Sequence, residues 1–451
     1  MKRAVALVVS VVSVITAGPA RGAPAGLRVV QSSAVSGPVA FPTGCSASQD
    51  ANEPQVAVDP RDPSHLVATY DLGAGGAAVI ASSSNGGVTW NRLAQPVLAE
   101  CGSGDKAQGQ DPSLAIASDG LVWTQQGYFD PDRTRAGHDA VREYSVVYGK
   151  DVSVADIGGE EALQRGWIAL GDAPGTAYVA TDHIDYAGTY VPGSPLSSVT
   201  LRATADGGKS WQTVSTIDTD APGHVLIVMG LQRTQGALVA VVADVFLPAA
   251  APELVATLGS TAPGTAYAYR STDGGRTWSR GDPIGQLPQC CLADAAVGPD
   301  GTLYVTWTEA ADRSDKTGDD VVIARSSDGG QTWQSSVAAH SVGPFPTSAV
   351  AVTSSGTVGL LWYATDPAQS GDIVPRFTVS RDEGNTWSEP VALASSFNPN
   401  AISSWNDTGP LGAYQDVAGL PDGFGVVFTQ GGSAARGGAS EVVYAHVIVG
   451  G

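Results

Sequence analysis

The chain has 451 residues, of which 43% are apolar, and it contains 56 glycines and 28 prolines. This composition is typical of a turn-rich, all-β protein with a large buried core. The formal charge of −20 argues against a nucleic-acid partner, because phosphate binding requires a basic face.

The first 25 residues predict a secretory signal peptide. A basic start at Met1 to Arg3 precedes an apolar run over residues 4–17 and a stretch of small residues over 18–25. The apolar run is too short to span a bilayer, and no later stretch reaches about 18 uninterrupted apolar residues. We therefore expect an exported protein with no transmembrane segment, whose mature chain, residues 26–451, forms one domain.

One phrase recurs along the mature chain: an apolar strand, a polar turn and a second apolar strand. Its seven occurrences start at Glu53, Asp111, Gly166, Val225, Ala293, Thr347 and Gln415. Units of about 55 to 70 residues indicate a repeat architecture, so we expect one closed array rather than the two or three domains that length alone suggests.

A second pattern, S/T-x-D-x-G-x-S/T-W, occurs in five of these units. Its acid or amide is Asn85, Asp206, Asp273, Asp328 or Asp382, and its tryptophan is Trp90, Trp211, Trp278, Trp333 or Trp387. The carboxylate can accept backbone N–H bonds as in an Asx turn. The second glycine is present in every copy, whereas the first is replaced by Glu383, so we expect the second to need a positive φ. Each copy predicts a hairpin turn followed by a tryptophan that packs between sheets.

These five copies resemble the Asp-box, or BNR repeat, of the sialidase-like β-propellers. The resemblance implies four-stranded blades, with the boxes joining the two outer strands on the face away from the active site. The second unit has no box, and the seventh ends at residues 441–450 without a fourth strand. The run near Val29 can supply that strand and close the ring, which favours seven blades. Six blades, as in the sialidases, is the alternative if the terminal segments merge differently.

The starts of the inner strands are the predicted site, together with the long inserts that follow the second strands. If units seven, one and two are adjacent, Asp416, Glu53 and Asp111 converge at one mouth. Clustered carboxylates can supply an acid beside a base, which glycoside hydrolysis requires. The alternative is that these acids only cap exposed N–H groups where strands begin.

The sialidase resemblance also implies a tyrosine nucleophile and arginines that bind the substrate carboxylate. Tyr414 with Glu309 can imitate the nucleophile pair, and Arg165 can contribute a cation. The Arg-Ile-Pro motif of the sialidases is missing, because Asn52, Glu53 and Pro54 stand in its place. A glutamate repels a carboxylate where an arginine clamps it, so a standard sialidase activity is not expected. The predicted ligand-binding residues are Arg165, Trp167, His224, Cys290, Cys291 and Glu309.

Four cysteines in an exported chain predict two disulfides. We favour a bond between Cys45 and Cys101 and a vicinal bond between Cys290 and Cys291, and the alternative joins the first unit to the fifth.

The six histidines show no ligand spacing, which argues against a zinc site. A loop with Asp312, Asp315, Asp319 and Asp320 could bind calcium, but its spacing misses the EF-hand pattern and a solvated acidic loop is favoured. Neither a metal nor another cofactor is therefore expected.

Together these features predict a secreted, monomeric propeller whose partner is a glycan or another extracellular polymer. The enzyme hypothesis is an exo-acting glycoside hydrolase that uses Glu53, Asp111 and Asp416, with Tyr414. The alternative is a non-catalytic, lectin-like or scaffold propeller.

Overall fold

We describe a computed structural model of the chain. It describes residues 26–39, 50–72, 78–94, 108–135, 138–157, 166–184, 197–218, 224–246, 263–287, 292–309, 319–342, 347–369, 371–402, 411–432 and 439–450. The predicted signal peptide and all four cysteines, and with them both predicted disulfides, lie outside these residues.

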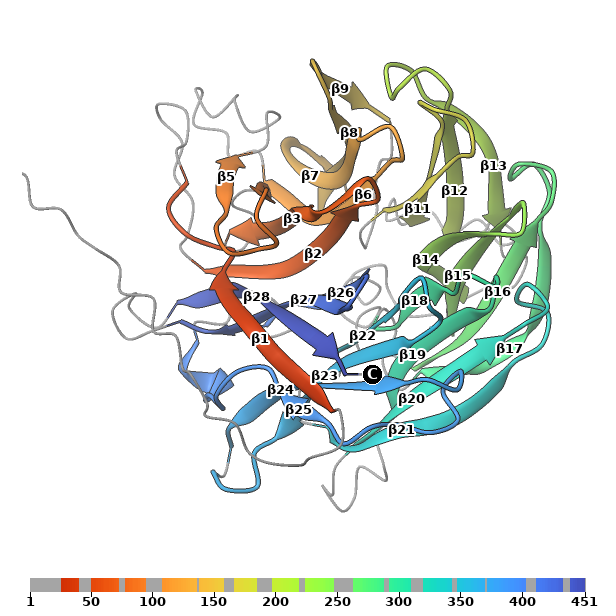
Figure 1. Cartoon of the computed structure of the whole chain (residues 1–451). Helices are drawn as coiled ribbons and strands as arrows, with labels where there is room; N and C mark the ends of the chain where they lie inside the picture. The colour runs from red at the N-terminus through yellow and green to blue at the C-terminus, as the bar shows by residue number, and fades with distance from the viewer. Residues whose placement is uncertain are drawn as a thin grey trace, which may run out of the picture.

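The strands form seven antiparallel four-stranded blades arranged in a ring, as Figure 1 shows. Blade one contains β2 (Ala51–Asp59), β3 (Asp62–Leu72), β4 (Ala78–Ser83) and β5 (Asn91–Ala94). Blade two contains β6 (Gln108–Ile116), β7 (Val122–Arg135), β8 (His138–Tyr148) and β9 (Val152–Asp156). Blade three contains β10 (Trp167–Leu170), β11 (Ala177–Ile184), β12 (Ser197–Thr204) and β13 (Gln212–Asp218). Blade four contains β14 (His224–Thr234), β15 (Ala237–Phe246), β16 (Gly264–Ser271) and β17 (Ser279–Leu287).

The last three blades follow the same order. Blade five contains β18 (Asp294–Val297), β19 (Leu303–Glu309), β20 (Asp319–Ser326) and β21 (Gln334–Val342). Blade six contains β22 (Ser348–Val352), β23 (Val358–Thr365), β24 (Ile373–Ser380) and β25 (Val391–Ala392), and the short 3-10 helix η2 (Pro399–Ala401) follows it. Blade seven contains β26 (Asp416–Leu420), β27 (Gly423–Gly431), β28 (Ser440–Val449) and β1 (Leu27–Ala34).

The two ends of the chain close the ring. Strand β1 pairs antiparallel with β28 from Leu27 opposite Val449 to Ala34 opposite Val443. In Figure 1 the red strand β1 lies beside the blue strand β28. This confirms the prediction that the run near Val29 supplies the fourth strand of the last unit, and with it the count of seven blades.

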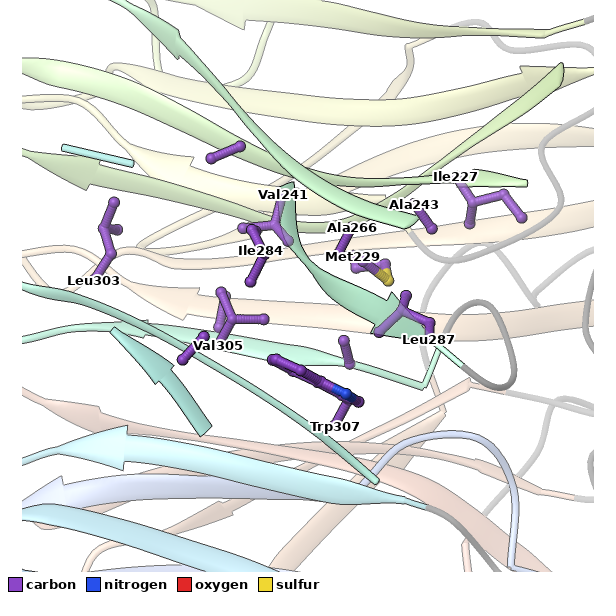
Figure 2. Close-up of a cluster of buried hydrophobic side chains, with 14 of the residues drawn as sticks. Ile227, Met229, Val241, Ala243, Ala266, Ile284, Leu287, Leu303, Val305 and Trp307 are labelled. Carbon is purple, nitrogen blue, oxygen red and sulfur yellow. The ribbon is translucent and has the colours of Figure 1, made fainter. Parts of the chain in front are cut away.

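The core lies between neighbouring blades. The second strands read as nearly continuous apolar runs, as in the ALVAVVADVF sequence of β15, because both of their faces are covered by other blades. Figure 2 shows the cluster between blades four and five, where Met229, Val241 and Ile284 of one blade face Val305 and Trp307 of the next. The fourth strands are more exposed, since they form the rim of the ring.

The Asp-box turns have one shared geometry. In the copy on blade four, Asp273 Oδ1 accepts the N–H of Thr277 at 3.0 Å and Asp273 Oδ2 accepts the Thr277 hydroxyl at 2.7 Å. Ser271 Oγ donates to Asp273 and accepts the N–H of Gly275 at 2.8 Å. The carboxylate is therefore fully used within its own turn.

Both glycines of the box, and not only the second, have a positive φ: 75° at Gly274 and 86° at Gly275. Their surroundings differ, because a Cβ on Gly275 would lie 2.0 Å from Leu201 of the neighbouring blade, whereas one on Gly274 would approach nothing closer than 3.6 Å. This explains why the first position accepts Glu383, which has a φ of 60°.

The insert after β7 is not a loop over its whole length. Strands β7 and β8 continue as a long hairpin, in which Phe129 pairs with Val141 and Asp130 with Ala140. No helix in the described part of the chain has the length and apolar character needed to cross a membrane.

Candidate functional site

The connectivity of the blades gives the ring two different faces. Each inner strand begins, and each second strand ends, on one face, while the Asp-box turns lie on the other. We call the first of these the strand-start face. A cavity of about 400 Å³ runs through the middle of the ring. All seven inner strands line it, among them Gln55, Ser113, Ile168, Gln232, Asp294, Val350 and Asp416.

Blades one and two begin with the same irregular backbone. Glu53 and Asp111 each precede a proline, each has a φ of 52°, and each lies where the register between the first and second strands shifts. A bulge of this kind re-aims a side chain out of the regular alternation of a strand. The two acids are thereby turned out of the strand pattern at equivalent places on adjacent blades.

The two acids meet a third one. One carboxylate oxygen each of Glu53, Asp71 and Asp111 lie within 4.8 Å of one another. Glu53 is 3% exposed and Asp71 is 1% exposed, while Asp111 is half-buried. We call these three residues the acidic cluster.

Backbone donors satisfy part of the acidic cluster. Asp71 Oδ2 accepts the N–H of Asp111 at 2.9 Å, and Glu53 Oε1 accepts the N–H of Ala413 from blade seven at 2.8 Å. Gly412 lies directly on Glu53, since a Cβ there would be 2.3 Å from its Cγ. Other atoms remain without a hydrogen bond among the described residues: Asp71 Oδ1 and both amide atoms of Asn52, which is 0% exposed.

Burial raises the pKa of the Asp71 carboxyl well above its usual range, and repulsion from the Glu53 carboxylate raises it further. The hydrogen bond from the Asp111 N–H opposes both effects. Ionised carboxylates this close together repel one another, and a proton or a cation relieves that repulsion.

Asp416 lies at the contact between blades seven and one. Its Oδ2 accepts the N–H of Val56 on blade one at 2.9 Å, and its Oδ1 accepts the N–H of Val417 at 2.8 Å. Asp294 does the same between blades five and six, where its Oδ2 accepts the N–H of Val350 at 2.9 Å. Tyr414, 6% exposed, lies in the buried segment that leads to β26.

His224 begins β14 and lies in a second polar group on the strand-start face. Its Nδ1 is 2.6 Å from Asp244 Oδ1, and its ring is 5.2 Å from that of Phe246. Phe246 is 58% exposed. An imidazole oriented by a carboxylate therefore stands beside an aromatic ring that solvent reaches.

The remaining predicted site residues are dispersed. Trp167 is buried and its indole N–H donates to the Val228 carbonyl at 3.2 Å, so its ring forms part of the core between blades three and four. Glu309 is exposed at the end of β19 and accepts the Trp307 indole N–H at 3.3 Å. Arg165, Cys290 and Cys291 lie outside the described residues.

Sequence reasoning missed Asp71, Asn52 and Asp244. Asp71 and Asp244 are acids near the ends of apolar second strands, and this interruption of an apolar run was the available signal. Nothing in the sequence said which blade start each one faces.

Part of the chain is similar to a known repeat family. The BNR repeat-like domain family matches residues 186–395. A xyloglucanase from Paenibacillus sp. is 33% identical over 121 residues, which are 26% of this chain, and the chain spans about a tenth of that protein, 11%. One similar solved structure is an ulvan lyase of a new polysaccharide lyase family, bound to GlcA(1-4)Rha3S. It is 14% identical to this chain and superimposes with a TM-score of 0.52, over 90% of this chain and 96% of the lyase chain. A second structure of the ulvan lyase superimposes with a TM-score of 0.53 over the same shares of the two chains.

Proposed function

We propose, from the premise that this chain is a sialidase-like BNR-repeat β-propeller, that it is an exported protein that recognises glycans on the strand-start face. Export rests on the predicted signal peptide over residues 1–25.

One observation carries this proposal: the two faces use their polar groups differently. The Asp-box carboxylates accept hydrogen bonds from their own turns, as Asp206, Asp328 and Asp382 do from the serine or threonine four residues on. On the strand-start face, by contrast, the exposed ring of Phe246 stands beside the His224 imidazole. An exposed aromatic ring next to a hydrogen-bonding group suits a sugar, because a sugar offers an apolar ring face and hydroxyl groups.

The similar proteins support a carbohydrate ligand. The ulvan lyase structure holds GlcA(1-4)Rha3S, and the Paenibacillus protein is a xyloglucanase. The lyase shares the fold with this chain and the xyloglucanase shares a short segment, and neither likeness specifies a ligand. We infer a carbohydrate ligand from these proteins together with the residues of the strand-start face.

Phe246 and His224 are the residues we assign to sugar contact. Phe246 can stack on a sugar ring, and the His224 imidazole can donate or accept a hydrogen bond at the edge of that ring. Both come from neighbouring strands that pair directly, His224 opposite Phe246, so their relative positions are fixed by the sheet.

Hydrolysis of the bound glycan is the second candidate. Glycosidases use a pair of carboxyl groups, and one carboxylate oxygen of Glu53 lies within 4.8 Å of one of Asp111. Asp111 is half-buried and is the member of the pair that solvent reaches, whereas Glu53 is buried and accepts the Ala413 N–H.

The test is a glycan array followed by turnover assays on chromogenic glycosides from pH 4 to 8. Saturable binding that Phe246→Ala weakens supports recognition, and Leu93→Ala, which removes another exposed apolar side chain on the outer strand β5, is the matched control. Release of an aglycone that Asp111→Asn abolishes supports hydrolysis. Folded protein that binds no glycan and releases no aglycone contradicts both candidates.

A further inference from the structure

We propose that the acidic cluster of Glu53, Asp71 and Asp111 binds one calcium ion, with the side-chain oxygen of Asn52 as a further ligand. This inference goes beyond the proposed function, because it concerns what occupies the cluster whether or not the strand-start face binds a glycan.

The first argument is the buried charge of Glu53 and Asp71. Glu53 and Asp71 are at least 97% buried, and the three carboxylates lie within 4.8 Å of one another. Among the described residues, neither Glu53 nor Asp71 forms an ion pair with a lysine, arginine or histidine. The carboxylates of both accept hydrogen bonds from backbone N–H groups. Buried charges in proteins are paired or coordinate metals, so a cation belongs among these oxygens.

The second argument is independent of the charge. Asp71 Oδ1 and the whole carboxamide of Asn52 are buried and have no hydrogen-bond partner among the described residues. Asn52 lies directly opposite Asp71 in the β2–β3 register, so both side chains project from the same face of the sheet. A buried polar group without a partner destabilises the folded state. Coordination of a cation would use both oxygens at once.

The ligand chemistry selects the ion. Three carboxylates and one carboxamide offer oxygen ligands without nitrogen or sulfur, the set that hard cations prefer. Calcium accepts six to eight oxygens in irregular geometry, whereas magnesium demands a near-ideal octahedron, so a site assembled from two bulged strand starts and one strand end fits calcium better. The half-buried Asp111 marks the side from which water, or a sugar hydroxyl, completes the coordination.

No sequence motif reveals this site, because its ligands are scattered along the chain. Glu53 and Asp111 come from two blade starts and Asp71 from the end of a second strand, so no loop carries a recognisable calcium motif. Calcium coordination and acid–base catalysis would compete for the same carboxylates, and calcium binding at the cluster therefore argues against hydrolysis there.

The experiment is a calorimetric titration of the chelator-treated full chain with calcium chloride alone, in the absence of glycan. We expect saturable binding of one calcium per chain and a rise in the thermal midpoint. Asp71→Asn and Glu53→Gln keep an acceptor oxygen for the backbone N–H groups but remove a charge, and each should weaken calcium binding by about tenfold or more.

Asp294→Asn is the matched control. Asp294, like Asp71, is a buried aspartate that accepts an inter-blade N–H at 2.9 Å. Asp294 lies outside the acidic cluster. The variant should bind calcium like the unsubstituted chain. If Asp71→Asn does not fold, the half-buried Asp111→Asn gives the same test.

The proposal is overturned if the unsubstituted chain shows no saturable heat and no thermal shift up to about 10 mM calcium, well above the weakest extracellular calcium sites. It is equally overturned if Asp111→Asn or Glu53→Gln binds calcium unchanged, or if Asp294→Asn weakens binding as much as they do. Because no glycan is present, none of these results depends on the proposed function.

Discussion

The glycine pair of the first Asp-box gives a sharp test of how blades pack. Gly86 and Gly87 both have a positive φ, 67° and 86°, so alanine at either position carries the left-handed backbone cost of about 1–2 kcal/mol. A Cβ on Gly86 meets no atom within 4 Å, whereas one on Gly87 would lie 2.3 Å from Cε1 and 2.6 Å from Cδ1 of Tyr444.

The Tyr444 ring cannot easily move away. It is 0% exposed and packs edge-on against Trp90 with the ring centroids 5.6 Å apart. Carbon atoms in contact prefer about 3.5–4.0 Å. Forcing an extra methyl group into a packed core costs about 1–3 kcal/mol, so we expect Gly86→Ala to lose about 1–2 kcal/mol of unfolding free energy and Gly87→Ala about 2–5 kcal/mol.

The assay is urea unfolding of both variants and the unsubstituted chain, followed by tryptophan fluorescence and compared at equal denaturant slopes. The comparison between the two variants isolates the contact with blade seven, because the backbone cost is shared. Equal losses would refute the reasoning, since they would mean that backbone conformation alone, and not packing between blades, requires the second glycine.

Three further predictions follow from the described contacts. The hydrogen bonds from the Ser210 and Thr386 hydroxyls lower the pKa of Asp206 and Asp382 from 3.8 to about 2, so their stabilisation is complete above pH 4 and is lost as the pH falls from 4 towards 2. The urea midpoint should fall as the pH is lowered across this range, and Asp382→Asn should make the midpoint depend less steeply on pH. The same pH dependence in Asp382→Asn as in the unsubstituted chain would count against this. Trp167→Ala should lower stability by about 3–5 kcal/mol, because its ring is core, and urea unfolding that shows no loss would place the ring outside the core. Asp416→Asn removes the charge from the hydrogen bond that joins blades seven and one and should cost about 1–3 kcal/mol, with glycan binding retained by the folded variant; loss of binding at full stability would instead give Asp416 a direct ligand role.

Among the predicted site residues, the structure brings together those that stand in repeated sequence contexts and separates those that do not. Glu53 and Asp111 stand in the same acid-Pro context, so their equivalence on adjacent blades could be read from the sequence, and the structure brings them together. Asp416 belongs to a similar strand start without the proline, and its two carboxylate oxygens accept backbone N–H groups instead. Trp167 begins an inner strand and lines the central cavity, and its indole N–H donates to the Val228 carbonyl of the next blade, so its ligand role stays a prediction.

The sequence by itself determined the repeat and the turn chemistry, and it favoured seven blades over six. The repeat and the turns depend on residues a few positions apart: the Asp-box is complete between Ser271 and Trp278, and strand pairing follows once each turn reverses the chain. The count of seven and the closure of the ring were decided by the tertiary structure, in which β1 pairs with β28 at the other end of the chain. Only the tertiary structure decided which acids meet. The Asp71 carboxylate reaches the Asp111 N–H across 40 residues and the Ala413 N–H reaches Glu53 across 360. The rotation and spacing of neighbouring blades set these contacts, and they arise from the packing of whole sheets, which no local pattern of residues encodes.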